Sequence, residues 1–401
     1  MDVALTSLAD AGKQAFGPQW QPAQVATAPG RVELLGNHVD YNGGLVLAGA
    51  IDRVIRAVGG RANVDEDTLL LHAPDVSADI VEVSISHPVI DDPEAQTTPG
   101  DYLTGIVQAL REARVPARGG QAIVVAGDVP VGFGMSSSAA LCVSLTLLVA
   151  GAPMEKASIV TVARHAEHLT GAPVGAMDQS ASVAGGVILF DGSTNDVEPL
   201  NPALGDHVFA VANSGVHHAL SESQYPQRVR ESRDALELIR ANANVAIQSL
   251  GELTPEQWGA IASRGPDWLA PTLRKRVQHV VSEVERVREG VKAIRSGDWP
   301  WFGELMTASG RSSAEEYEIS HPVVEELVSL LHDQPGVLGA RMMGGGEGGP
   351  ALALLHRDAV ERVREVLARE FFDPRRMDAA DAFEICSFGA GARIEDLNLA
   401  Q

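Results

Sequence analysis

A glycine- and serine-rich stretch between two apolar runs limits most strongly what this chain can fold into. The stretch is GDVPVGFGMSSSAA, from Gly127 to Ala140, and the β-branched run 123–125 precedes it. A run of small and apolar residues that suits a helix follows through Leu141 and Val143. The order strand, glycine-rich loop and helix turns backbone N–H groups and the positive end of a helix toward an anion such as phosphate.

The residue types within this loop favour the same interpretation. Gly132 and Gly134 allow the backbone to approach an anion without interference from a Cβ atom. Ser136, Ser137 and Ser138 add hydroxyl groups that suit phosphate oxygens or a Mg²⁺ ion. The loop is not the common P-loop, because GxxxxGK[ST] does not occur in the sequence. Taken alone, the stretch also fits a serine-rich loop that only caps a helix.

A second polar segment, RVELLGNHVDYNGGLVLAGAID, begins at Arg31. Two apolar, strand-like pieces flank its polar centre, and Asn-Gly-Gly is typical of a tight turn. A turn does not need an arginine, a histidine and an aspartate beside it, and Arg31, His38 and Asp40 suit the hydroxyl groups of a small polyol. A solvated hairpin tip is the alternative.

A third candidate is Asp178, which lies among small residues in GAPVGAMDQSASVAGG. Burying an aspartate costs free energy unless it has a partner, and Arg31 and Glu167 are the candidate partners. An aspartate that only caps a helix is the alternative.

Composition bounds the class of protein. The 401 residues suffice for two domains, and the formal net charge of −22 argues against a nucleic-acid partner. Cys142 and Cys386 lie far apart, which fits a reducing cytoplasm. The chain starts without a signal-peptide pattern and has no run of eighteen apolar residues, so we expect no membrane segment. The pair His217-His218 would point to opposite faces of a strand, which argues against a metal site there.

Three stretches, in the same order along the chain, resemble the motifs of the galactokinase, homoserine kinase, mevalonate kinase and phosphomevalonate kinase superfamily. The segment that begins at Arg31 resembles the signature specific to galactokinases, and the serine-rich loop resembles the superfamily's phosphate loop. GARMMGGGEGGPALALL, from Gly339, resembles the glycine-rich third motif. The resemblance implies an α+β fold of two domains, residues 1–200 with the first two motifs and residues 201–401 with the third. The active site would lie in the cleft between them, with the third motif against the phosphate loop.

The resemblance also implies an activity, which is phosphorylation of the anomeric hydroxyl of galactose by ATP with Mg²⁺. It implies a monomer that binds the sugar and ATP, but neither nucleic acid nor a membrane. The residue roles that it implies are Asp178 as catalytic base with Arg31 beside it; Arg31, Asn37, His38, Asp40, Gly175, Asp178 and Tyr225 on the sugar; Gly132, Gly134, Met135, Ser136, Ser137, Ser138 and Ala139 on ATP; and Ser138 and Glu167 on Mg²⁺.

The chain departs from the galactokinase pattern at several positions. Galactokinases usually have glutamate where Asn37 stands, and that glutamate contacts the C6 hydroxyl of the sugar. Asn37 therefore leaves open a kinase for a related sugar, such as galacturonate, arabinose or N-acetylgalactosamine. A sugar-sensing relative without catalysis is a further alternative, although Ser138-Ala139 is intact, and a mevalonate-type kinase is disfavoured by the first motif. Glu347 stands where an aromatic residue is usual, and we expect its side chain to point to solvent.

Overall fold

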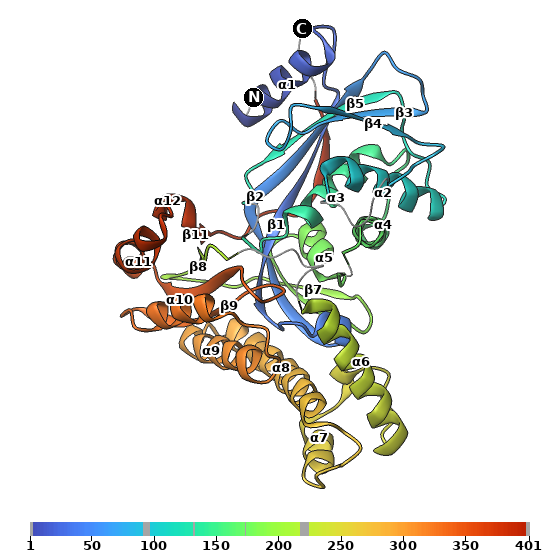
Figure 1. Ribbon diagram of the computed structural model, residues 1–401. Helices are drawn as coiled ribbons and strands as arrows, with labels where there is room; N and C mark the ends of the chain where they lie inside the picture. The colour runs from blue at the N-terminus through green and yellow to red at the C-terminus, as the bar shows by residue number, and fades with distance from the viewer. Residues whose placement is uncertain (1–2, 91–96, 131–132, 173, 217–223, 398–401) are drawn as a thin grey trace.

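Two β-sheets with helices packed against them form the framework of the computed structural model (Figure 1). The structure describes residues 3–90, 97–130, 133–172, 174–216 and 224–397. Strands and helices are mixed along the chain, in the predicted α+β class. Within these residues, no helix is both long enough and apolar enough to cross a membrane.

The first sheet is built around two long, antiparallel strands from the start of the chain. In the described residues its order is β12-β1-β2-β5-β3-β4, with β6 and β7 alongside the first part of β2. β3 and β5 run parallel, and the other neighbouring strands run antiparallel. The strands are β1 (Gln24–Leu35), β2 (Leu45–Arg61), β3 (Thr68–His72), β4 (Ile80–Ser84), β5 (Gln121–Gly127), β6 (Val187–Asp191), β7 (Val197–Leu200) and β12 (Arg393–Asp396).

Four helices pack together on one side of this sheet, and a fifth packs on β5 (Figure 1). The helix α3 follows the serine-rich loop and is apolar on nearly all sides, so it lies buried between β1, β2 and its neighbouring helices. The helix α2 starts with a capping box between Thr98 and Asp101. The helices are α1 (Val3–Phe16), α2 (Pro99–Glu112), α3 (Ser137–Val149), α4 (Lys156–Leu169) and α5 (Met177–Ala184).

The second sheet has the order β11-β8-β10-β9 in the described residues, and its neighbouring strands are antiparallel. Its strands are β8 (His207–Asn213), β9 (Val337–Met342), β10 (Pro350–His356) and β11 (Phe383–Cys386). The helices of this half are α6 (Tyr225–Asn242), α7 (Pro255–Ala262), α8 (Pro271–Ser296), α9 (Trp299–Glu315), α10 (Pro322–His332), α11 (Val360–Leu367) and α12 (Ala379–Ala382). Each helix from α6 to α10 has a proline in its first turn, where the missing N–H costs nothing.

Short turns of 3-10 or π helix complete the fold. They are η1 (Asp40–Asn42), η2 (Leu250–Glu252), η3 (Arg357–Ala359), η4 (Ala368–Phe372) and η5 (Asp373–Arg375). The turn η1 occupies the polar centre of the first motif, between β1 and β2. The sequence did not predict the strand β7, nor the strand β12, which returns from the end of the chain to the first sheet.

A buried arginine joins the two sheets. Arg341 on β9 is fully buried, and its Nη2 donates to the backbone oxygen and to Oε1 of Glu33 on β1, both at 2.8 Å. Its Nε donates to the backbone oxygen of Leu34 at 3.3 Å. The third motif, which continues from Arg341, is thereby fixed against the end of β1.

Candidate active site

Arg31 and Asp178 form the centre of the site. Arg31 lies in β1, and Asp178 lies in the first turn of α5. The guanidinium Nε and Nη2 of Arg31 donate to Oδ1 and Oδ2 of Asp178, both at 2.8 Å. This two-pronged geometry fixes the carboxylate, and the positive end of α5 favours its charge. The Asp178 side chain keeps 21% of its surface exposed against 8% for Arg31, so the carboxylate is the partner that a ligand can reach.

The serine-rich loop is tied to the same pair. The Nη1 of Arg31 donates to the Gly134 oxygen at 2.5 Å, and the Arg31 backbone N–H donates to the Met135 oxygen at 3.0 Å. The Ser136 hydroxyl donates to Oδ2 of Asp178 at 2.5 Å. The loop, the strand β1 and the helix α5 therefore meet at one carboxylate.

The start of α3 offers backbone N–H groups to a ligand. Ser136 is the N-cap residue in a left-handed conformation, with φ of 55°, and it makes no side-chain cap because its hydroxyl is committed to Asp178. Without a cap, the first N–H groups of α3 are left for an anion. Ser137, Ser138 and Ala139 form this first turn. The loop's predicted contact with the third motif is present, because a Cβ added at Gly134 would meet Pro350 at 3.1 Å.

Two of the predicted ATP residues need comment. The side chain of Met135 is buried in a hydrophobic cluster, so only its backbone can face a nucleotide. Gly132 lies outside the described residues, as do the paired histidines 217 and 218.

Glu167 on α4 lies behind this loop with only 2% of its surface exposed. The pKa of the Glu167 carboxyl is raised to about 7, mainly by burial and also by the charge of Asp178, although hydrogen bonds from Ser138 and Gln179 act in the opposite direction. The amide Nε2 of Gln179 donates to Glu167. The Gln179 Oε1 atom is buried without a hydrogen-bond partner among the described residues.

This group has the oxygen chemistry that a magnesium ion requires. A carboxylate, a hydroxyl and an unpartnered amide oxygen are hard ligands, and a cation beside Glu167 would oppose the burial that raises the pKa of its carboxyl. In the described part of the chain, His, Cys, Asp and Glu side chains form no cluster of three that suits a metal. The residues therefore fit an ion that takes few protein ligands and keeps water or phosphate oxygens, as Mg²⁺ does.

The first motif supplies the wall opposite Asp178. Asp40 begins η1, and a Cβ added at Gly175 would lie 1.7 Å from its Oδ2 atom, so only glycine fits at position 175. The pKa of Asp40 is raised to about 7, mainly by burial and also by the like charges of Asp178 and Glu33, although a hydrogen bond from the Tyr41 backbone opposes the shift. Asp40 thus faces the same space as Asp178.

His38 is held neutral inside a group of aromatic rings. Its Nε2 lies 3.1 Å from the Gly345 oxygen and its Nδ1 lies 2.8 Å from the Tyr41 hydroxyl. A carbonyl oxygen only accepts, so Nε2 carries the proton and Nδ1 accepts from Tyr41. Burial lowers the pKa of His38 to about 3. Its ring centroid lies 4.8 Å from that of Tyr225, which starts α6. The hydroxyl of Tyr41 also lies 2.9 Å from the hydroxyl of Tyr317.

Asn37 turns its side chain inward, away from the expected sugar contact. The residue is fully buried, and its Nδ2 donates to Glu33 Oε1 at 3.1 Å and to the Gly344 oxygen at 3.0 Å. Its Oδ1 accepts from the Ser313 hydroxyl at 3.0 Å. Both amide protons and the amide oxygen are used within the protein, so this geometry does not support the predicted contact of Asn37 with the C6 hydroxyl.

Comparison with known proteins agrees with the three motifs. The galactokinase galactose-binding signature matches residues 13–61, the GHMP kinases N terminal domain matches residues 101–186, and the GHMP kinases C terminal model matches residues 291–373. The galactokinase of Streptococcus suis is 31% identical over 392 residues, which cover 95% of this chain and 97% of that protein. The galactokinase of Bos taurus is 33% identical over 382 residues, which cover 92% and 93%. This chain belongs to the galactokinase family.

Solved structures support the same relationship. The crystal structure of Lactococcus lactis galactokinase complexed with galactose matches with a TM-score of 0.87 at 27% identity, over 98% of this chain and 100% of that chain. The Methanococcus jannaschii mevalonate kinase shares the fold, with a TM-score of 0.63 at 15% identity over 93% of this chain and 96% of that one. The predicted family, the α+β fold and the enzyme class are confirmed, and this member of the galactokinase family is an ATP-dependent kinase.

Three features of this galactokinase-family site were missed by sequence reasoning. Glu33 lies two residues after Arg31 in β1, so both side chains are on the same face of the strand. The sequence signal for it was an acidic residue within an apolar run. Gln179 directly follows Asp178, but its contact with Glu167 depends on the packing of α5 on α4. Glu347 was expected to point to solvent, and this is wrong: its Oε2 accepts from the Gln224 backbone N–H at 2.8 Å, where α6 begins.

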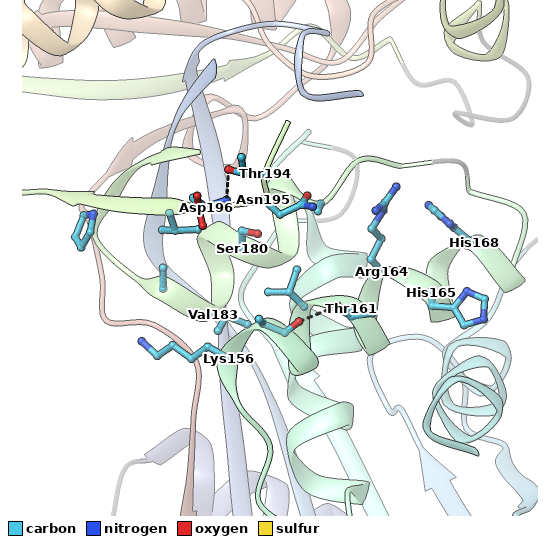
Figure 2. A pocket seen from close by; sticks show the side chains of 16 residues that line it. Lys156, Thr161, Arg164, His165, His168, Ser180, Val183, Thr194, Asn195 and Asp196 are labelled. Carbon is cyan, nitrogen blue, oxygen red and sulfur yellow. Dashed lines mark hydrogen bonds between the residues drawn. The ribbon is translucent and has the colours of Figure 1, made fainter. Parts of the chain in front are cut away.

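A cavity of about 860 Å³ lies apart from these residues, between α4, α5 and the turn that joins β6 to β7 (Figure 2). The side chains of Lys156 and Arg164 line it from α4, and Asn195 and Asp196 line it from the turn. None of the predicted site residues lines it. One hydrogen bond connects the cavity to the site: Arg164 Nε donates at 3.2 Å to the backbone oxygen of Val174, which precedes Gly175.

Proposed function

We propose that this kinase transfers the γ-phosphoryl group of ATP to the anomeric hydroxyl of galactose, with Asp178 accepting the hydroxyl proton. The proposal rests on the hydrogen bonds that Arg31 and Ser136 donate to Asp178. These bonds hold Asp178 at the start of α3, which has no side-chain cap. They bring a proton acceptor and an anion-binding helix end together. The galactokinase relatives support galactose as the sugar.

Arg31 has two tasks in this mechanism. Its positive charge lies beside Asp178, where it would stabilise the negative charge that develops during phosphoryl transfer. It also fixes the direction of the carboxylate through two hydrogen bonds. A positioned general base contributes roughly 10²- to 10⁴-fold to the rate, and placing the reactants in line supplies much of the rest.

The first turn of α3 would hold the phosphates of ATP. Ser137, Ser138 and Ala139 present N–H groups there, and Gly134 allows close approach of the backbone. We assign Ser136 differently from the sequence, because its hydroxyl holds Asp178 rather than standing free for a phosphate.

Glu167 and Ser138 would hold a magnesium ion between the loop and α4, which supports Mg²⁺ as the metal used with ATP. When bound, such an ion neutralises charge on the phosphate oxygens. The positive charge of such an ion would favour the ionised form of Glu167, against the burial that raises its pKa.

The sugar would lie between Asp178 and η1. Asp40 faces Asp178 across this space, Gly175 leaves room for the Asp40 carboxylate, and the rings of His38 and Tyr225 form a wall. Asn37 does not reach this space with a free polar atom, so a kinase for another sugar remains the second candidate. A sugar sensor without catalysis is less well supported, because Asp178, Arg31 and the first turn of α3 are assembled for transfer.

The domain division belongs to this proposal. We place the boundary near residue 200, between β7 and β8, so that residues 1–200 hold the first two motifs and residues 201–401 hold the third. The last strand, β12, then completes the sheet of the first domain. We also propose a cytoplasmic monomer.

The test is ADP release, measured with a coupled assay in the presence of Mg²⁺, for galactose, galacturonate, arabinose, N-acetylgalactosamine and glucose. The expected result is a kcat/KM for galactose well above the others. Preference for another sugar would move the proposal to that sugar. Binding of galactose and ATP without turnover of any sugar would replace the kinase by the sensor.

A further inference from the structure

The buried pair of Glu33 and Asn37 carries an inference about sugar specificity. The two side chains are in contact, since Asn37 Nδ2 donates to Glu33 Oε1 at 3.1 Å. The resemblance to galactokinases implies a sugar-contacting glutamate where Asn37 stands. Here both amide protons of Asn37 are taken by protein groups, its oxygen accepts from Ser313, and the residue is fully buried. The carboxylate of the pair lies instead on Glu33, one hydrogen bond away.

We propose that Glu33, rather than Asn37, is the residue that accepts a hydrogen bond from the C6 hydroxyl and so selects the sugar. This inference rests on the proposed function, because it assigns a contact within the same sugar site. Glu33 is then a specificity-determining residue that the first motif does not reveal.

The position of Glu33 in β1 directs it toward the site. Arg31 and Glu33 pair with Ala50 and Ala48 of β2, and the register between them is regular, with irregularities only before Arg31 and after Glu33. Side chains two residues apart in a strand lie on the same face. Because Arg31 reaches Asp178 from that face, Glu33 lies beside the proposed base.

The two oxygens of Glu33 have different surroundings. Oε1 accepts from Asn37 and also from Nη2 of Arg341, at 2.8 Å. The hydrogen bonds recorded for the Glu33 carboxylate within the described residues fall on Oε1, and the side chain keeps 7% of its surface exposed. One oxygen is therefore anchored and the other is left for a ligand hydroxyl.

The charge of Glu33 also acts on two residues of the predicted sugar wall. The Glu33 charge contributes to the raised pKa of Asp40 in η1 and of Tyr225 at the start of α6. These two residues come from different segments and both belong to the predicted sugar wall. A carboxylate within electrostatic reach of both lies at the edge of that space.

Arg341 and Asn37 act as supports for this carboxylate. Arg341 is fully buried on β9 and holds Glu33 from the second sheet, while Asn37 donates from the turn that follows β1. A carboxylate held by two fixed donors loses little conformational freedom on binding. It accepts a hydroxyl and repels a sugar carboxylate, so galacturonate becomes a poor substrate even though position 37 is neutral.

The decisive experiment compares Glu33→Gln, the two single exchanges Glu33→Asn and Asn37→Glu, and the double exchange E33N/N37E. Glu33→Gln keeps the shape and an acceptor for Arg341, and the exposed Glu82→Gln on β4 is the control. Each protein is assayed with galactose, 6-deoxygalactose and galacturonate, and sugar binding is also measured by calorimetry without ATP.

We expect wild type to bind galactose better than 6-deoxygalactose, and Glu33→Gln to lose most of this preference. Its KM for galactose should rise roughly 10- to 100-fold, because a hydrogen bond to a charged group is lost. The kcat and the KM for ATP should stay within about threefold, the scatter of independent sites. The double exchange, which returns the carboxylate to position 37, should recover the preference that both single exchanges lose.

Retained preference for galactose over 6-deoxygalactose in Glu33→Gln would overturn the inference, as would a double exchange no better than Glu33→Asn. A purely structural role would lower stability in Glu33→Gln without changing the ratio between the two sugars, and that result also counts against it. Failure of the proposed function is a separate result, because it would appear as wild type that turns over none of the sugars while the calorimetric comparison still tests Glu33.

Discussion

Two sets of buried carboxylates, one at the joint between the sheets and one in the site, differ in how fully the protein satisfies them. Glu283 on α8 is fully buried and accepts from the Gly36 N–H at 2.9 Å, and from the Ser309 hydroxyl and Arg286 Nε at 2.6 Å each. Burial alone would raise its pKa, but Arg286 and the other donors lower it to about 2. Glu167 is also buried and Asp40 is half-buried, and the pKa values of both carboxyls are raised to about 7.

The difference shows that the supply of donors, rather than depth, separates a structural carboxylate from a functional one. Glu283 has a cation and several hydrogen-bond donors beside it, so groups of the protein itself stabilise its negative charge. Asp40 and Glu167 face other carboxylates and lack a comparable set. A carboxyl that lacks hydrogen-bond donors and a cation within the protein marks the place where a hydroxyl group or a cation of a ligand completes the site.

Asp178→Asn should have the largest effect on catalysis and tests the functional half of this comparison. The amide keeps the shape but cannot accept the hydroxyl proton, so kcat should fall roughly 10²- to 10⁴-fold. Coupled ADP release checks the loss, and the exposed Asp381→Asn on α12 is the control. Unchanged kcat would show that Asp178 is not the base.

Glu283→Gln tests the structural half. It removes the charge that pairs with Arg286 in a buried setting, so the free energy of unfolding should fall by about 3 kcal/mol. The matched control is Glu285→Gln on the same helix, whose exposed pair with Arg288 should contribute less than about 1 kcal/mol. Urea unfolding checks both. Equal losses in the two variants would contradict the contrast, and at low temperature the folded Glu283→Gln protein should retain its kcat.

Gly175→Ala tests whether the place of Asp40 matters to sugar binding. The new Cβ would lie 1.7 Å from Asp40 Oδ2, so the carboxylate must move. We expect the KM for the sugar to rise about tenfold, the value of one well-placed hydrogen bond, with little change for ATP. Gly259→Ala in α7, where a Cβ meets nothing within 4 Å, is the control. A sugar KM that moves no more than in the control would separate Asp40 from binding.

Asp40→Asn should give the smallest effect, visible as a change with pH. The folded pKa of about 7 exceeds the ordinary 3.8, so between these values the native state keeps a proton that the unfolded state has released. The stability of wild type therefore falls as pH rises from about 4 to about 7, and this share of the loss is absent in Asp40→Asn. Without ligand, the urea midpoint of the variant should rise relative to that of wild type as the pH increases across this window. A gap that stays constant with pH would contradict the raised pKa of Asp40.

Local sequence was enough to locate the segments of the site. Gly134 was expected to allow an unusual backbone, and it has a positive φ of 59°, whereas the positive φ of Ser136, 55°, was not predicted. The position of Asp178 among small residues predicted a buried, paired carboxylate, and Arg31 is that partner. The strands of the first motif and the helices that begin with proline were predictable for the same reason, since their signals lie within a few residues.

Side-chain direction in the first motif was not predictable. Asn37 is adjacent to a sugar-lining histidine, but its partners Gly344 and Ser313 lie about three hundred residues further along the chain, at separations of 307 and 276. The same holds for Glu283, whose donors include the backbone of Gly36. Spacing along one segment cannot show that a distant turn will supply two hydrogen bonds and turn an amide inward.

The strand β12 has a consequence for the order in which the molecule is made. Gln24 of β1 pairs with Asp396, and the two are 372 residues apart. A ribosome that releases the chain from the N-terminus leaves the outer edge of β1 without this neighbour until translation is nearly complete. An open strand edge is a template for pairing with another chain. The nascent protein therefore passes through a long interval in which its first sheet is exposed to misassembly, and truncation before residue 393 would make that interval permanent.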